Sequence, residues 1–296
     1  MSTFFDTHCH YNLEPLYSGK SAYRLKVYNE DPSIEYNWRH HWKKSQEKKV
    51  NKAVIVGTNK LYIDRAIEIA QTDPNLFASI GFHPEAYANL AKKNDQKEIE
   101  TTIAEQEGHL TNLLNNHSKK SIVAIGEIGL DYYRLKKDDE HRKLTIISQQ
   151  QALKMQLKIA IKHKLPAIIH VRDQGRQAYL DILKILKQFY PSDSPFILHC
   201  ISGSKEYVKQ ALDLGAYIGF SGIVTYKNTD SLKEILKFTP PNKRLIETDA
   251  PFLAPLEYKG KLCEPWMLSL TGIYLHEKFN VDLDLLVENS HKVFSV

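Results

Sequence analysis

Two histidines flank a cysteine in the stretch FFDTHCHYN (4–12), close to the start of the chain. The three residues could form a Cys/His zinc site, a thiol nucleophile with its base, or one edge of a larger site. His8 and His10 are two positions apart, so on a strand both side chains would lie on one face and Cys9 on the other. This spacing favours a metal site that uses both imidazoles and is completed elsewhere in the chain.

Other residues that can bind metals or transfer protons stand where further apolar segments end. These are His83, Glu127, His170, His199, Ser221 and Asp249. Burying several imidazoles and carboxylates is costly unless a cation or mutual pairing compensates, so a metal centre explains them better than unrelated structural roles. The predicted metal ligands are His8, His10, Glu127, His170, His199 and Asp249.

Six nitrogen and oxygen ligands exceed the needs of one tetrahedral zinc with an open position, which favours two divalent ions. The ligand types suit Mg²⁺, Mn²⁺, Zn²⁺ or iron. Two ions about 3.5–4 Å apart would activate a water molecule and stabilise the entering and leaving oxygens of an in-line displacement. Glu127 lies between the two histidine pairs in strand order and is predicted to bridge the ions. Asp249 is predicted to hold one ion and to orient or deprotonate the water.

Thiol and serine chemistry fit the sequence less well. The three cysteines, Cys9, Cys200 and Cys263, give neither a disulfide framework nor a CxxC metal pair. Strand alternation predicts that Cys9 and Cys200 point away from the metals, and there is no GxSxG motif. The adjacent histidines of WRHHW (38–42) would point about 100° apart on a helix, which favours surface or packing roles.

A fold that brings these distant residues together is indicated by two alternating types of segment. Apolar, β-branched segments predict eight strands, at 4–10, 52–58, 77–84, 121–129, 166–172, 195–200, 216–222 and 244–249. Apolar residues every three to four positions predict helices between them, as at 149–164, 175–189 and 204–215. This alternation predicts an α/β protein, a (β/α)8 TIM barrel with the metal site at the C-terminal ends of its strands. A doubly wound open sheet is the alternative, but no GxGxxG or Walker loop supports it.

The chain is expected to form a single domain over residues 1–296, because no linker or internal repeat divides it. Polar segments at 11–50 and 85–120 are expected to be extended barrel loops with added helix. The polar start lacks a signal peptide, and no apolar run approaches the roughly 20 residues of a membrane span. We therefore expect a soluble, cytoplasmic protein with no membrane partner. The net charge of +5 is a weak indication of a polyanionic partner.

The ordered motifs of the chain resemble those of the TatD-type metal-dependent hydrolases, deoxyribonucleases of the amidohydrolase-like barrel group. The matching motifs are DTHCH (6–10), GFHPE (81–85), GEIGLDYYR (126–134), LPAIIHVRD (165–173), LHCISGS (198–204), YIGFSGIVTYKN (217–228) and IETDAPFLAP (246–255). The resemblance covers nearly the whole chain apart from the two long segments. It implies a metal-dependent phosphodiesterase that acts on DNA with exonuclease character.

The resemblance also implies roles for single residues. His8 and His10 would bind one ion with Glu127 and Asp249, and Glu127 would bridge to a second ion held by His170 and His199. His83 would contact the scissile phosphate. Arg172 would be either a phosphate clamp or a partner of Asp173, and Glu247 a buried partner of the site rather than a ligand. Cys263 and Ile201 depart from the Asn and the aromatic residue common in the family, which affects the expected shape of the substrate groove.

The leading hypothesis is therefore a deoxyribonuclease with two divalent ions and DNA as its substrate. A second hypothesis is that the same metal ions hydrolyse a carboxylic ester rather than a phosphodiester. The protein would then be an ester hydrolase such as a deacylase of mischarged tRNA, with RNA or tRNA as partner. A third is a nucleic-acid-binding protein with a vestigial barrel, against which the complete set of metal ligands argues. The sequence does not indicate an oligomeric state.

Overall fold

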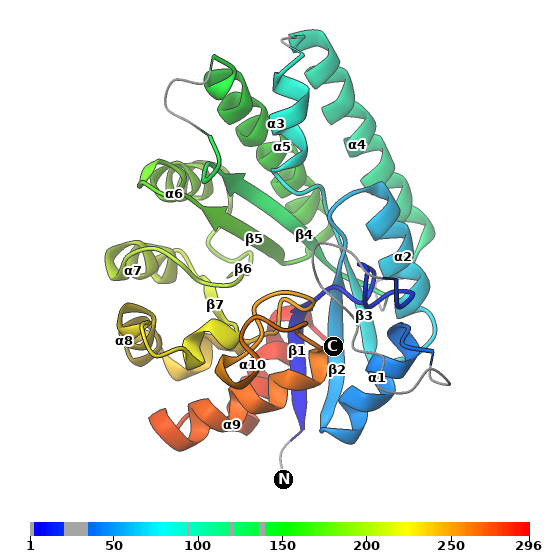
Figure 1. Cartoon of the computed structure of the whole chain (residues 1–296). Helices are drawn as coiled ribbons and strands as arrows, with labels where there is room; N and C mark the ends of the chain where they lie inside the picture. The colour runs from blue at the N-terminus through cyan, green and yellow to red at the C-terminus, as the bar shows by residue number, and fades with distance from the viewer. Residues whose placement is uncertain (1–2, 21–34, 94, 119–120, 136–139) are drawn as a thin grey trace.

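Eight parallel strands, hydrogen-bonded in chain order, form the centre of the computed structural model, which describes residues 3–20, 35–93, 95–118, 121–135 and 140–296 (Figure 1). The strands are β1 (Phe4–Cys9), β2 (Val50–Val56), β3 (Leu76–Ile80), β4 (Ile122–Asp131), β5 (Ala167–Arg172), β6 (Phe196–Leu198), β7 (Tyr217–Phe220) and β8 (Arg244–Ile246). Sequential order with alternating helices confirms the predicted TIM barrel. The doubly wound alternative is wrong, because its strand order would be permuted.

The described helices are α1 (Trp38–Glu47), α2 (Lys60–Ala70), α3 (Ala86–Ala91), α4 (Gln96–Asn116), α5 (Arg142–His163), α6 (Gln177–Phe189), α7 (Lys205–Asp213), α8 (Asp230–Phe238), α9 (Leu268–Phe279) and α10 (Leu283–Phe294). The helices predicted at 149–164, 175–189 and 204–215 are confirmed as α5, α6 and α7. Helix α1 lies within segment 11–50, and α3 and α4 lie within 85–120. None of the helices in the described part of the chain has the length and apolar character needed to cross a membrane.

The first and last strands are joined mainly beyond their ends. Asp249 N donates to His8 O at 2.9 Å, and His10 N donates to Ala250 O at 2.8 Å. The buried carboxylate of Asp6 accepts from His8 N at 3.2 Å and from the backbone and hydroxyl of Thr248 at 3.0 and 2.6 Å. These contacts nearly close the barrel, and they fix His8 and Asp249 relative to one another.

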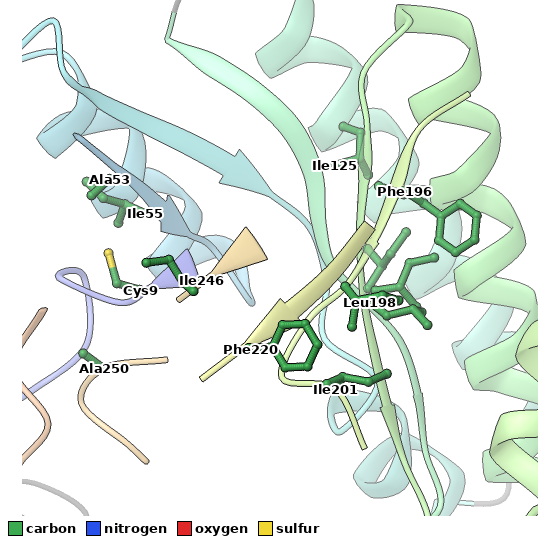
Figure 2. Close-up of a cluster of buried hydrophobic side chains, with 14 of the residues drawn as sticks. Cys9, Ala53, Ile55, Ile125, Phe196, Leu198, Ile201, Phe220, Ile246 and Ala250 are labelled. Carbon is green, nitrogen blue, oxygen red and sulfur yellow. The ribbon is translucent and has the colours of Figure 1, made fainter. Parts of the chain in front are cut away.

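Apolar side chains fill two layers of the structure. An inner cluster includes Phe5, Phe77 and Ile168 from the strands and Phe294 from α10. An outer cluster lies between strands and helices, and Figure 2 shows Cys9 in it near Ala53, Ile55 and Ile246. Since alternate residues of a strand face the two layers, polar side chains can occupy the inner face only where the apolar filling stops.

Helix α1 is fixed to the loop that follows β8 by a buried ionic cluster. His41 Nδ1 lies 3.0 Å from Glu264 Oε2, and Lys44 Nζ lies 2.9 Å from Glu264 Oε1. His41 is buried, so the packing role predicted for the adjacent histidines holds for this residue. Burial opposes ionisation of Glu264, but the hydrogen bond from His41 and the charge of Lys44 outweigh it and lower its pKa to about 2.

Replacing Glu264 is expected to weaken the attachment of α1. Glu264→Gln should lower the free energy of unfolding at pH 7 by about 1–3 kcal/mol, because two charge-assisted contacts lose their acceptor charge. Because the pKa of Glu264 is lower in the folded than in the unfolded protein, its stabilising effect is complete above about pH 4.5 and is lost as the pH falls toward 2. The difference in unfolding free energy between Glu264→Gln and wild type should therefore shrink over this pH range. Urea titrations at several pH values measure this.

The matched control is Glu98→Gln on α4, whose carboxylate pairs with Lys93 at the surface. Exposed pairs contribute little, so this variant should stay within about 1 kcal/mol of wild type. Equal losses in both variants would contradict the structural role assigned to Glu264.

Candidate metal centre

A cleft of about 910 Å³ opens at the C-terminal ends of the strands. Its walls include six of the residues singled out from the sequence, namely His10, His83, Glu127, His170, His199 and Asp249. His8 lies below them, fully buried. Residues separated by up to about 240 positions thus become neighbours, because all strands of the barrel end at the same face.

Glu127 lies at the middle of the group and divides it in two. Its Oε2 atom is 3.5 Å from His8 Nε2 and 4.0 Å from His10 Nε2. Its Oε1 atom is 3.0 Å from His170 Nδ1 and 3.1 Å from His199 Nε2. Each carboxylate oxygen therefore faces its own pair of imidazoles, as expected of a ligand that bridges two cations.

Asp249 joins the first of these two groups. Its Oδ1 atom lies 3.4 Å from His10 Nε2 and 3.6 Å from His8 Nε2. Asp249 follows the end of β8 by three residues and has a φ of 57°, in the left-handed region. This backbone conformation turns the chain beside β1 and places the carboxylate within the cleft.

His83 stands three residues beyond β3, on the side of the second group. Its Nε2 atom is 3.6 Å from Glu127 Oε1, and its ring meets that of His170 edge-on at 4.5 Å between centroids. Glu85 N donates to His83 Nδ1 at 3.2 Å, so a neutral ring carries its proton on Nε2. Burial lowers the pKa of His83 to about 4, which keeps the ring neutral near pH 7.

Two further carboxylates hold the imidazoles of the second group from behind. Asp131 Oδ2 lies 3.2 Å from His170 Nε2, and Glu247 Oε1 lies 3.3 Å from His199 Nδ1. Asp131 hydrogen-bonds one ring nitrogen of His170, and Glu247 lies within ion-pair distance of one ring nitrogen of His199, while the other nitrogen of each ring faces Glu127. Carboxylates commonly orient metal-binding histidines in this manner.

Glu247 is fully buried beside His199, and its role as a buried partner rather than a ligand stays a prediction. Asp131 was not singled out from the sequence. Asp131 lies four residues beyond Glu127 on the same strand and therefore on the same face. That even spacing is the signal that could have identified it.

Strand β7 makes room for Glu247 at Gly219. A Cβ atom at Gly219 would lie 2.4 Å from Glu247 Oε2, well inside van der Waals contact. The glycine therefore permits a fully buried carboxylate to reach His199 from the neighbouring strand.

Glu127 and the imidazoles around it have the electrostatic character of a cation-binding site. Burial works against ionisation of Glu127, yet the surrounding imidazoles, His199 foremost, hold its pKa well below the ordinary range. Burial would lower the pKa of His170, but its bonds to Asp131 and Glu127 raise it to about 9. The site thus stabilises positive charge beside Glu127, which bound cations would supply.

Ligand atoms lie close enough together to hold metal ions. In each of three groups the atoms are within 4.8 Å of one another, namely His8, His10 and Glu127; His83, Glu127 and His170; and His8, His199 and Glu247. Nitrogen and carboxylate oxygen are ligands for Mn²⁺, Zn²⁺ and related ions, so the residues fit the predicted type of cofactor. The number and identity of the ions stay predictions.

The cysteines behave differently from one another. Cys9 is buried in the outer layer with Sγ 3.5 Å from Val54 O, away from the metal centre as predicted. Cys200 instead lines the cleft, with Sγ 3.3 Å from Ser221 Oγ, so the alternation argument is wrong there. Strand β6 ends at Leu198, and Cys200 has a φ of 44°, which breaks the alternation. Burial raises the pKa of the Cys200 thiol to about 12, which disfavours a thiolate nucleophile.

The two positions that depart from the family pattern lie in different environments. Ile201 forms part of the cleft wall, where it shapes the space beside His199. Cys263 is buried next to Glu264, in the loop that holds α1. Only Ile201 is thus placed to affect substrate directly.

Comparison with known proteins gives matches along the whole chain. The family described as TatD related DNase matches residues 5–295. The chain is 29% identical over 296 residues to the uncharacterized metal-dependent hydrolase YabD of Bacillus subtilis, covering 99% of each protein. It is 32% identical over 303 residues to the uncharacterized metal-dependent hydrolase MG009 of Mycoplasma genitalium, covering 98% of each.

Solved structures of TatD-family proteins have the same fold as this chain. YJJV, a TatD homologue from Escherichia coli, aligns with a TM-score of 0.75 at 25% identity, over 99% of this chain and 98% of that one. A TatD family hydrolase from Entamoeba histolytica aligns with the same TM-score at 20% identity, over 99% and 98% of the two chains. The likeness therefore includes the strand ends that carry the candidate metal centre.

Removing the charge behind His170 is expected to weaken metal binding. Asp131→Asn should reduce the affinity for one bound ion by about 10- to 100-fold, because the imidazole loses its orienting carboxylate. Equilibrium dialysis with Mn²⁺ or Zn²⁺ and elemental analysis measures the change. Asp181→Asn is the control, since Asp181 accepts from Tyr132 and Gln177 away from the ligands. Equal affinity in both variants would contradict the role of Asp131.

A methyl group at Gly219 is expected to displace Glu247. Gly219→Ala should lower metal affinity by a factor similar to that of Glu247→Gln, because the first displaces the carboxylate from His199 and the second removes its negative charge. Gly108→Ala on α4 is the matched control, since its Cβ would meet nothing within 4 Å. That substitution should raise stability by about 0.5–1 kcal/mol and leave metal binding unchanged. Normal metal affinity in Gly219→Ala would show that Glu247 is not required at its present position.

Proposed function

Because the chain belongs to the TatD-related DNase family of metal-dependent hydrolases, we propose that it is a phosphodiesterase that hydrolyses DNA with two divalent ions. One observation supports this most strongly: the two oxygens of Glu127 face separate histidine pairs. In the proposed centre, His8, His10 and Asp249 would hold one ion, His170 and His199 would hold the other, and Glu127 would contribute to both.

The ions would supply Lewis-acid activation of water and neutralise charge on the phosphodiester. Asp249 provides the base. Burial opposes its ionisation, but the hydrogen bond from His10 and the charge of His199 lower its pKa, so it is a carboxylate at neutral pH. Its position on the cleft wall allows it to orient the attacking water and accept a proton.

His83 is proposed to bind the scissile phosphate rather than a metal. Its Nδ1 atom accepts from Glu85 N, which leaves the Nε2 hydrogen for a ligand in the cleft. A neutral ring can donate this hydrogen to a non-bridging phosphate oxygen without proton transfer. His170 and His199, in contrast, each have one nitrogen beside a second carboxylate and the other nitrogen facing Glu127.

The cleft is suited to a substrate with both charged and flat apolar parts. Asn59, Asn89 and Arg134 lie on its wall, and so do apolar residues from the segments that follow β7 and β8, namely Ile223, Leu232 on α8, Phe252 and Leu253. Nucleotides combine a polar backbone with bases that stack on apolar side chains. This composition supports nucleic acid as the substrate class, with DNA as our proposal.

Incubation with labelled substrates tests the reaction. We expect the purified protein to shorten single- or double-stranded DNA with Mg²⁺ or Mn²⁺ and to be inactive with EDTA. RNA and acylated tRNA are compared under the same conditions. Metal-dependent loss of the acyl label with intact nucleic acid would overturn the nuclease proposal in favour of a deacylase.

Substitutions test the roles of the two central carboxylates. Asp249→Asn should lower kcat by about 10²–10⁴-fold, as expected when a general base is lost. Glu127→Ala should abolish turnover, because both metal groups lose their shared ligand. Cys9→Ser is the control: it retains a donor for Val54 O and should keep activity within about twofold. Large loss of bound metal in Cys9→Ser would instead favour a Cys/His zinc site.

A further inference from the structure

Arg172 stands at the end of β5, beside the second group of metal ligands. It follows His170 by two residues, so both side chains lie on the same face of the strand, about 6–7 Å apart along it. Both residues line the cleft. Arg172 itself is exposed, which leaves it accessible to a substrate.

An aromatic ring holds the guanidinium of Arg172 in place. Its Cζ atom lies 4.1 Å from the centroid of the Tyr133 ring, which follows the end of the neighbouring strand β4. Such stacking restricts the long side chain while its N–H groups can still bind a ligand. Tyr133 is 39% exposed, so the stacked pair lies at the surface, where a ligand can reach the guanidinium.

The charge of Arg172 is not neutralised by the carboxylates nearest to it in sequence and register. Asp131, its register partner on β4, accepts from Tyr133 N and contacts His170. Asp173 accepts from Gly175 N and Ala178 N at the start of α6, so the pairing with Arg172 considered from the sequence is not formed. Among the residues that the structure describes, Arg172 has no ion pair.

Arg134 also lies on the cleft wall, but unlike Arg172 it forms an ion pair. Its Nη1 atom lies 2.8 Å from Glu85 Oε1, so this cation already has an anionic partner. Arg172 is thus the better placed of the two cations to receive an anion from the substrate.

We propose that Arg172, stacked on Tyr133, binds the phosphate adjacent to the scissile one. The inference rests on the proposed nuclease function and assigns a subsite to it. A guanidinium presents paired N–H donors that match a phosphate. Arg172 lies on the wall of the same cleft as His83 and His170, so a chain bound at the candidate metal centre can extend past it. The subsite therefore recognises a polynucleotide in preference to an isolated phosphodiester.

Trithymidylates with one neutral linkage test the proposal. A trithymidylate has two phosphodiester linkages, and in each of two isomers a methylphosphonate replaces one of them. The linkage that can still be cleaved then has an uncharged neighbour on its 5′ side in one isomer and on its 3′ side in the other. Product identification gives kcat/KM for each linkage of the parent. In wild type, one isomer should be cleaved about tenfold or more slowly than the same linkage in the parent, the effect of losing one charge-assisted contact.

Arg172→Met should lower kcat/KM for the parent by a similar factor and reduce the penalty of the neutral linkage to less than about twofold. Arg39→Met is the matched control: Arg39 is also exposed and stacked on an aromatic ring, at 4.3 Å from Trp38, but lies on α1 outside the cleft wall. In Arg39→Met, the neutral linkage should slow cleavage as much as it does in wild type. Circular dichroism verifies that all variants are folded.

Two results would overturn the subsite: equal cleavage of both isomers and the parent by wild type, or an undiminished penalty in Arg172→Met. Failure of the nuclease proposal has a different signature. In that case wild type with metal cleaves neither linkage of the parent trithymidylate, and the proposed subsite is rejected together with the nuclease function.

Discussion

A carboxylate buried near the axis of a barrel must be surrounded by positive charge, and this requirement organises the candidate metal centre. Glu127 is only 5% exposed, and both of its oxygens need partners. Imidazoles from β1, β5 and the end of β6 supply them, two on each side. The arrangement is possible because the apolar filling of the barrel stops below this level, so polar side chains can occupy the inner face of the strands.

The ligands are in turn held by a second set of contacts that are less apparent from the sequence. Asp131 and Glu247 fix the rings of His170 and His199, and Asp6 ties the backbone of His8 to Thr248. These acidic residues are buried or partly buried and would be costly without their partners. The geometry of the candidate metal centre thus depends on a surrounding layer of acidic side chains as well as on the candidate ligands.

The alternation of segments and the polar residues at strand ends were sufficient to predict the barrel and to bring the candidate ligands together. They depend on short, nearly continuous apolar segments, as at β2, and on a helical periodicity of 3.6 residues, as at α6. Prediction failed where periodicity ends: Cys200 follows a three-residue strand and turns into the cleft. Contacts between distant side chains, such as His41 with Glu264 and Arg172 with Tyr133, leave no periodic signal. Whether residues 1–296 form one domain stays a prediction.

The junction of β1 with the segment after β8 has a consequence for biosynthesis. The bond from Thr248 to Asp6 joins residues 242 positions apart, and the same junction places Asp249 beside His8 and His10. A contact of such long range forms only after most of the chain has emerged from the ribosome. His8 and His10, two of the six candidate ligands, are therefore synthesised early, but they meet Asp249 only after the segment beyond β8 has been made. Assembly of the complete centre is thus a late event that coincides with closure of the barrel, so partly synthesised chains lack the full set of ligands.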